Sequence, residues 1–132
     1  MKNIRRNVSK SLLFICLSLT LATIVFASAR IDVPSRPGKP MFMDVWIDGC
    51  KFEFEAPMHD GGSRVINYLI ECRDGAWGMG RWRLLGTSRV LQYTVQNMVE
   101  GTKADFRVKA VNEAGESAPS EVSDVVIFKD KW

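Results

Sequence analysis

The feature that most restricts the fold of this chain is a two-residue alternation of apolar and polar side chains after residue 48. Alternation with this period places every second side chain on the same face of a β-strand, so that one face can enter a core. No stretch after residue 29 keeps the apolar period of about 3.6 residues that marks an amphipathic helix. The sequence therefore predicts an all-β fold.

Turn residues separate the alternating segments at short intervals. The alternation runs through residues 50–55, 68–73, 93–96 and 104–110, and a β-branched run covers 122–128. Asp-Gly or Asn-containing turns lie between these segments, at 48–49, 60–63, 74–75, 100–101 and 112–115. These residue types supply the positive φ angles that chain reversals need. Short strands with a turn about every 8–12 residues are typical of an antiparallel β-sandwich.

Residues 1–29 have the organisation of a secretory signal peptide. The positively charged residues of this segment precede its apolar run and are Lys2, Arg5, Arg6 and Lys10. The run from Leu12 to Phe26 is uncharged, and Ala27-Ser28-Ala29 follows it. A basic start, an apolar centre and small residues at the end are what signal peptidase requires. We therefore expect cleavage after Ala29 and a secreted, extracellular protein.

A signal-anchored membrane protein is the alternative, and it is the only case in which we expect contact with a membrane. Such an anchor needs about 20 apolar residues, and the uncharged run Leu12–Phe26 is shorter than that. Once residues 1–29 are removed, Lys plus Arg nearly equals Asp plus Glu. A near-neutral domain has no general attraction for nucleic acid, so no nucleic-acid partner is expected.

Several short motifs occur in an order that matches a known family. They are Pro37-Gly38-Lys39-Pro40, Phe54-Glu55-Ala56-Pro57, Asp60-Gly61-Gly62-Ser63, Asn67-Tyr68-Leu69-Ile70-Glu71, Trp82, Phe106-Arg107-Val108-Lys109-Ala110-Val111-Asn112 and Ala114-Gly115-Glu116-Ser117-Ala118-Pro119-Ser120. Residues 37–128 thereby resemble a fibronectin type III domain, most of all the modules of giant muscle proteins such as titin and twitchin. The resemblance implies a seven-stranded, immunoglobulin-like β-sandwich, with a lead-in at 30–36 and a short tail at 129–132.

Two positions depart from the pattern of this family. Phe54 stands where the family usually has a core Trp, and Ala104 stands where it usually has the tyrosine of the tyrosine corner. A large-to-small change of the second kind costs about 3–5 kcal/mol unless neighbouring side chains refill the space. We therefore expect another feature of this chain to offset the missing ring.

The resemblance also suggests a crosslink between two cysteines. In the family's arrangement, Cys50 and Cys72 lie on strands of opposite sheets, face inward and come close at one end of the sandwich. A disulfide between them would contribute about 3 kcal/mol in the loop-entropy picture. Sheets packed about 10 Å apart need local narrowing before such a bond forms, so two buried free thiols are the alternative. Cys16 lies in the predicted leader.

No residue pattern indicates catalysis, a metal site or a cofactor, and we expect the protein not to be an enzyme. The only histidine is His59, in the turn before Asp60. Zinc requires three or four His, Cys or carboxylate ligands, and a Ser-His-Asp triad requires groups brought together from distant segments. His59 is therefore interpreted as a solvated turn residue.

The remaining candidates for function are on the surface. The segment 73–83 concentrates Arg, Gly, Trp and Met. Of these residue types, Arg, Trp and Met are enriched in the centres of protein interfaces. The candidate partner-binding residues are Trp77, Met79, Arg81 and Trp46. Packing within the domain is the alternative for the tryptophans, with Trp46 covering an edge strand and Trp77 folding back on its loop. Trp82 matches a family position, and we expect it to pack on the sheet.

A second candidate surface is electrostatic. The side chains that would form a basic face are Arg73, Arg83, Arg107 and Lys109. Such a face would suit a sulfated glycan or an acidic protein, but Glu71 and Asp105 interrupt it, and a mixed, solvated face is the favoured alternative.

The resemblance implies a protein-binding or adhesion module without catalysis, and the predicted leader implies that this single-domain module is secreted. The alternative is a structural fragment of a larger protein with tandem fibronectin type III and immunoglobulin repeats. One sandwich serves many partners, so the fold leaves the identity of the partner open.

Overall fold

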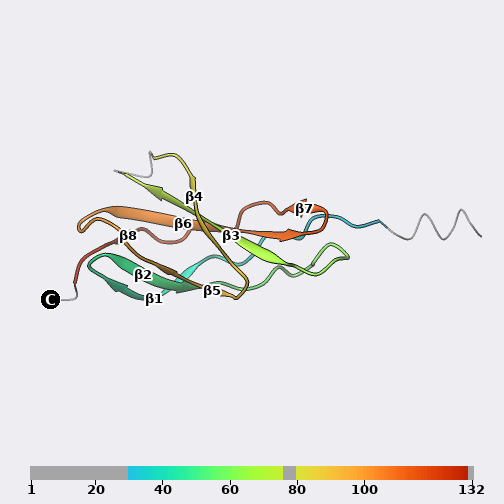
Figure 1. Cartoon of the computed structure of the whole chain (residues 1–132), viewed down its shortest axis with the longest axis horizontal. Helices are drawn as coiled ribbons and strands as arrows, with labels where there is room; N and C mark the ends of the chain where they lie inside the picture. Colours follow the sequence, from blue (N-terminus) through green and yellow to red (C-terminus); the bar gives the residue numbers. More distant parts are fainter. Residues whose placement is uncertain (1–29, 76–79, 131–132) are drawn as a thin grey trace, which may run out of the picture. The chain divides into compact units, whose positions relative to one another are not determined.

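The computed structural model of the chain describes residues 30–75 and 80–130, which fold into two antiparallel sheets. The strands are β1 (Met41–Trp46), β2 (Gly49–Glu53), β3 (Asn67–Asp74), β4 (Arg83–Ser88), β5 (Gln92–Val95), β6 (Lys103–Asn112), β7 (Gly115–Glu116) and β8 (Val126–Ile127). One sheet has the order β1-β2-β5 and the other β4-β3-β6-β7, with β8 also pairing β6. Figure 1 shows the two sheets as separate layers. The predicted all-β fold is confirmed.

The core lies between the two layers and follows from the alternation in the sequence. Every second residue of β2, β3 and β6 is buried, because those side chains face the opposite sheet. Phe52 of β2 and Phe106 of β6 meet across the sandwich, with ring centroids 5.3 Å apart. Phe54, at the family's tryptophan position, is 4 % exposed and packs edge-on against Tyr68 with a centroid distance of 5.0 Å. A phenylalanine therefore fills that core position.

The last strand differs from the continuous one expected at 122–128. β7 and β8 pair with opposite ends of β6, on the side away from β3, and the chain between them is not a strand. Three buried serines, spaced three residues apart, connect this segment to β6: Ser117, Ser120 and Ser123. Each serine donates its backbone N–H to a β6 carbonyl, and its Oγ accepts the N–H of that same β6 residue. We call residues 117–123 the serine-bridged segment.

Hydroxyl oxygens thus replace the main-chain carbonyls that a regular strand would offer to β6. The three bonds from β6 to serine Oγ are each 2.9 Å long, and the three bonds in the other direction are each 2.8 Å long. Because every buried N–H of β6 on this side is satisfied, the segment can leave β-conformation without the cost of an unpaired donor.

The lead-in before β1 is bonded into the domain. The Asp32 N–H donates to the Gly61 carbonyl, Ser35 and His59 are linked by main-chain and hydroxyl bonds, and the Gly38 N–H donates to the Glu55 carbonyl. The buried side chain of Asn112, the last residue of β6, donates to the carbonyls of Asp32 and Asp60, both at 2.7 Å. One amide therefore ties the lead-in, the loop after β2 and the β6–β7 turn together.

The side chain at position 104 is small and buried, where the family usually has a tyrosine ring. Ala104 is 2 % exposed and pairs with Val126 of β8. Phe128 follows β8, is fully buried in the same core, and exchanges backbone hydrogen bonds with residues 101–102. The segment after β8 therefore adds a buried aromatic ring to the core that contains Ala104.

Candidate binding surfaces

The outer face of the β4-β3-β6 sheet carries a stack of aromatic and cationic groups. Trp82, immediately before β4, lies between two guanidinium groups, with the Arg73 Cζ 4.6 Å and the Arg107 Cζ 4.4 Å from its ring. Contacts at this distance are cation–π interactions. The expectation that Trp82 packs on the sheet agrees with this arrangement.

Each of these arginines is also held by an acid on the neighbouring strand. Arg73 of β3 makes two bonds to its cross-strand partner Asp105 of β6, with Nη2–Oδ2 at 2.6 Å and Nε–Oδ1 at 3.0 Å. Arg107 of β6 donates twice to its partner Glu71 of β3, at 3.3 Å. The hydrogen bond to Asp105 raises the pKa of the Arg73 guanidinium. Because the members of each arginine–carboxylate pair lie opposite each other, the register of β3 and β6 determines which residues pair.

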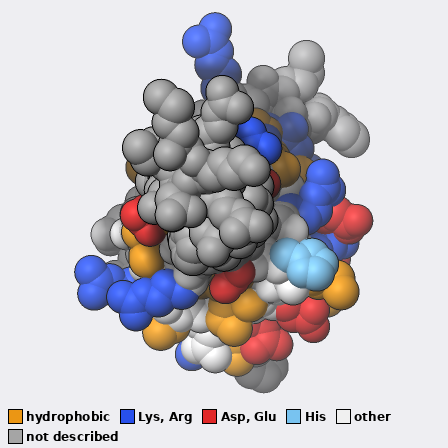
Figure 2. Space-filling model, turned by 90° about the vertical axis from the view of Figure 1, so that its right-hand side faces the viewer, with side chains coloured by type: hydrophobic (Ala, Val, Ile, Leu, Met, Phe, Trp, Pro, Cys, Tyr) orange, Lys and Arg blue, Asp and Glu red, His pale blue; other side chains and the backbone are white. Residues whose placement is uncertain are grey.

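The remaining cations of the candidate basic face are paired as well. Lys109 lies 3.2 Å from Glu71 and 3.7 Å from Glu116, and Arg83 lies 3.2 Å from Asp74. The structure therefore brings the four predicted residues onto one sheet and gives each an acidic partner. Figure 2 shows positive and negative side chains interspersed at one end of the molecule as well.

Glu71 is the centre of this charge network. Burial alone would raise the pKa of its carboxyl group, but hydrogen bonds and attraction from Arg107 and Lys109 outweigh burial and hold the pKa below its usual value. The carboxylate is therefore ionised at neutral pH and contributes to folding in that form.

The candidate partner-binding residues are placed only in part. Trp77 and Met79 lie outside the described residues. Arg81 is exposed, and no bond of its side chain to another described residue is present. Trp46, at the end of β1, is half-buried, and its indole lies over Gly49, where a Cβ atom would come within 2.9 Å of Nε1. Trp46 therefore packs over the start of β2, beside the β1–β2 turn.

The two cysteines of the domain are free thiols in this structure, so the suggested disulfide is not formed. Cys50 lies on β2 and Cys72 on β3, in different sheets, and both are fully buried. Face-to-face sheets are about 10 Å apart, beyond the Cα separation that a disulfide spans. Burial, with a contribution from Cys72, raises the pKa of Cys50 to about 12, and burial raises the pKa of Cys72 to about 11.

His59 is exposed, and its hydrogen bonds to Ser35 use only the backbone atoms of His59. Within residues 30–75 and 80–130, no three His, Cys, Asp or Glu side chains are placed to hold a metal ion. The same residues contain no helix that is long and apolar enough to cross a membrane.

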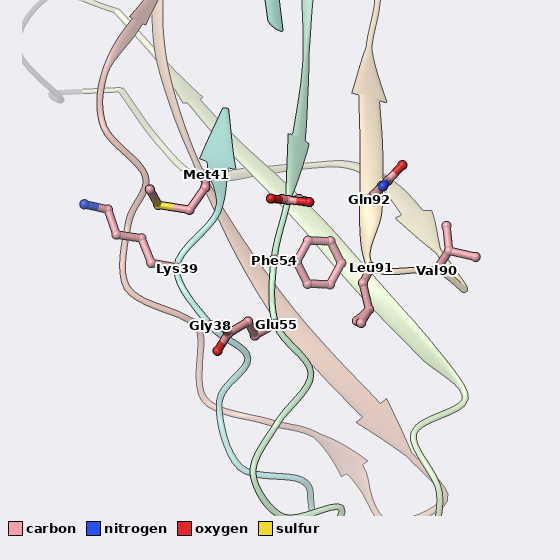
Figure 3. Close-up of a pocket in the computed structure, with 9 residues that line it drawn as sticks. Gly38, Lys39, Met41, Phe54, Glu55, Val90, Leu91 and Gln92 are labelled. Atoms are coloured by element: carbon pink, nitrogen blue, oxygen red, sulfur yellow. The ribbon is translucent and has the colours of Figure 1, made fainter. Parts of the chain in front are cut away.

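The structure also contains a groove that the sequence analysis did not predict. It lies on the outer side of the β1-β2-β5 sheet and has a volume of about 1020 Å³. Its lining comes from three segments: Gly38, Lys39 and Met41; Glu53, Phe54 and Glu55; and Val90, Leu91 and Gln92. Figure 3 shows these segments side by side, with the end of β2 in the middle. Exposed apolar residues distant in sequence meet here, and only the sheet order reveals this.

Comparison with known proteins identifies the domain. The sequence model of the fibronectin type III domain matches residues 35–126. The chain is 36 % identical over 100 residues to the titin homolog of Caenorhabditis elegans. This alignment covers 75 % of this chain and, to the nearest per cent, 0 % of the titin homolog. It is 37 % identical over 95 residues to cardiac-type myosin-binding protein C of Mus musculus, covering 70 % of this chain and 7 % of that protein.

Solved structures agree with the sequence relatives. Domains A168–A170 of titin match with a TM-score of 0.70 and 38 % identity, over 76 % of this chain and 34 % of that one. The twitchin kinase region of Caenorhabditis elegans matches with a TM-score of 0.72 and 29 % identity, over 76 % of this chain and 17 % of that one. The chain thus spans only a small part of each of these relatives. The two-layered sheets, the matched motifs and these similarities together show that the chain belongs to the fibronectin type III domain family.

Proposed function

We propose that this domain is a non-catalytic module that binds another protein through its exposed strands and loops. The observation that carries the proposal is the match to the fibronectin type III family over residues 35–126. One relative, myosin-binding protein C, is named for binding a protein. The described residues also present surfaces suited to contact, namely the exposed Arg81 and the apolar groove on the β1-β2-β5 sheet.

The candidate contact residues can be tested by capture of protein partners. The domain, with and without single substitutions Trp77→Ala, Arg81→Ala and Trp46→Ala, is immobilised and the captured proteins are compared by mass spectrometry. We expect Trp77→Ala and Arg81→Ala to lose partners that the wild type retains, because truncation of interface aromatic and arginine residues is the most costly kind. Equal capture by all variants would remove the 73–83 segment from the proposal.

Secretion is part of the proposal and rests on residues 1–29. Their charged start, apolar centre and Ala27-Ser28-Ala29 end support a cleaved leader. Expression of the full chain in a secretory cell and N-terminal sequencing of the medium protein test it. We expect the sequence to begin at Arg30; a chain that begins at Met1, or is retained in membranes, would favour the signal-anchored alternative.

A second candidate function is a structural unit of a tandem-repeat protein. The relatives favour it, since the titin homolog and myosin-binding protein C are far longer than this chain and match it over only a small part of their length. The natural transcript distinguishes the two functions: a reading frame that continues through further repeats of this kind would support the structural unit.

A further inference from the structure

The groove on the β1-β2-β5 sheet combines apolar walls with unpaired acidic groups. Glu53 and Glu55 are exposed, and neither carboxylate bonds to another described residue. The cation of the lining, Lys39, lies 3.0 Å from Asp124, an exposed acid outside the lining. Met41 is 56 %, Val90 65 % and Leu91 40 % exposed. The lining of the groove therefore combines apolar side chains with two unpaired carboxylates and one cation that is paired with an acid outside the groove.

The three segments that line the groove are held in fixed positions. On one side the Gly38 N–H donates to the Glu55 carbonyl at 2.9 Å, and a Cβ atom on Gly38 would come within 2.9 Å of the Glu55 Cβ. On the other side the Phe54 N–H donates to the Leu91 carbonyl at 3.1 Å. Backbone contacts thus set the width of the groove, so it needs little rearrangement to receive a ligand.

The strand register places the exposed side chains in a defined pattern. Met41, Glu53 and Gln92 are paired residues of β1, β2 and β5, and they form one row across the sheet. Glu55 lies two residues beyond Glu53 on the same face, because the intervening Phe54 is buried. Side chains two residues apart on an extended strand are separated by about 6.7 Å. Figure 3 shows Met41 on one side of Phe54, and Leu91 and Val90 on the other side.

We propose that this groove binds an extended peptide segment of a partner protein in which lysine or arginine occupies alternate positions. Alternate residues of an extended peptide have the same spacing as Glu53 and Glu55, so two cationic groups can reach the two carboxylates together. The aliphatic stems of lysine or arginine would lie on Met41, Val90 and Leu91, while their charged ends reach the acids. The proposal rests on the proposed protein-binding function and specifies its ligand.

A synthetic peptide that alternates lysine with valine is a direct probe, and one that alternates glutamate with valine is its control. The peptides are titrated into the domain, and backbone amide shifts are followed by NMR. We expect only the lysine peptide to bind, with shifts concentrated in residues 38–41, 53–55 and 90–92. Shifts spread over the whole domain, or absent, would overturn the proposal.

A matched pair of charge variants separates the groove from general electrostatic attraction. The double substitution Glu53→Lys with Glu55→Lys reverses the acids of the groove, and Glu113→Lys with Glu121→Lys makes the same change in net charge at two other exposed acids. We expect the first pair to weaken the lysine peptide at least about tenfold and the second to weaken it far less. Equal weakening by both pairs would show that net charge alone attracts the peptide and would overturn the proposal.

Failure of this proposal and failure of the protein-binding function give different results. If the wild type and the Glu53→Lys, Glu55→Lys variant capture partners equally, the protein-binding function stands and the proposal for the groove is rejected. A domain that captures no protein loses the proposed function, while the peptide titration still decides whether the groove binds cationic peptides. Self-association of the domain that these two substitutions abolish, without peptide binding, would assign the face to a second copy of the chain and overturn the proposal.

Discussion

At the scale of single residues, the most informative position is Ala104, where the family has a tyrosine. The sequence analysis expected compensation for the missing ring and considered a disulfide, but Cys50 and Cys72 are free thiols. The structure instead places the fully buried Phe128 beside residues 101–102. A side chain more than twenty residues away was not an obvious source of compensation, because its position depends on how the last strand docks against β6.

Phe128→Ala is therefore predicted to be strongly destabilising, since it removes a fully buried ring from the core. We expect a loss of about 3–5 kcal/mol in the free energy of unfolding, measured by urea titration. Its neighbour Ile127 is 38 % exposed, and Ile127→Ala serves as the control with a clearly smaller loss. Similar losses for the two variants would show that Phe128 has no special role in the core.

Glu71 gives the domain a predictable response to acid. Its pKa is lower in the folded state than the ordinary value of 4.5, chiefly through Arg107 and Lys109 acting against burial. The stabilisation is therefore complete above the unfolded-state pKa and is lost as the pH falls through the folded-state pKa. We expect Glu71→Gln to reduce the free energy of unfolding at pH 7 by about 1–2 kcal/mol. On acidification, the free energy of unfolding of this variant should fall less than that of the wild type.

Urea titrations of the wild type and Glu71→Gln at pH 7 and at pH 3 measure this difference. Glu113, which is exposed, gives the control variant Glu113→Gln, for which we expect no change in the pH dependence. A wild type and Glu71→Gln with parallel pH profiles would contradict the role assigned to this carboxylate.

At the scale of secondary-structure elements, β2, β3 and β6 were predictable because their alternation is a local pattern. The last strand was not, since the run at 122–128 has strand propensity but contains only β8 as a strand. The serines at 117, 120 and 123 carry a spacing of three that the analysis of the sequence did not use. That spacing is the signal by which the serine-bridged segment could have been recognised, although its partner strand is known only from the fold.

Ser120→Ala tests the serine-bridged segment. The substitution removes the acceptor for the buried Val108 N–H, which Ser120 Oγ now receives at 2.9 Å. An orphaned buried donor costs about 1–3 kcal/mol. We expect a loss of this size in urea unfolding and faster hydrogen exchange at the Val108 amide, whereas Thr94→Ala, at an exposed position on β5, should change neither. Unaltered exchange at Val108 would contradict the bridging role.

At the scale of the whole molecule, two buried thiols report on the integrity of the sandwich. Their raised pKa values, about 12 for Cys50 and about 11 for Cys72, follow mainly from burial. We expect both to resist alkylation in the native domain at pH 8 and to react together, without a reductant, once the domain is unfolded. The folded domain keeps each thiol protonated at a pH where the unfolded chain would ionise it. The free energy of unfolding should therefore decline as the pH rises above 9.0, the ordinary pKa of a cysteine thiol.

Mass spectrometry after alkylation, with and without denaturant, measures this behaviour. Two labels that appear only in denaturant are the expected result. A domain that takes up no label after unfolding, until a reductant is added, would show a bonded pair and contradict the free thiols. Rapid labelling of the native domain would instead show that this end of the core opens readily.

The sequence by itself determined the all-β class, the inward residues of the central strands and the absence of a catalytic pattern, because two-residue alternation and turn chemistry are local properties. Tertiary structure decided how charges pair and where the exposed apolar residues meet. Arg73 faces Asp105 and Arg107 faces Glu71 only because β3 and β6 adopt one register. The groove beside Glu53 and Glu55 exists only because residues 38–41 and the turn before β5 flank the end of β2. These contacts join segments far apart in the chain, and no local pattern encodes their register.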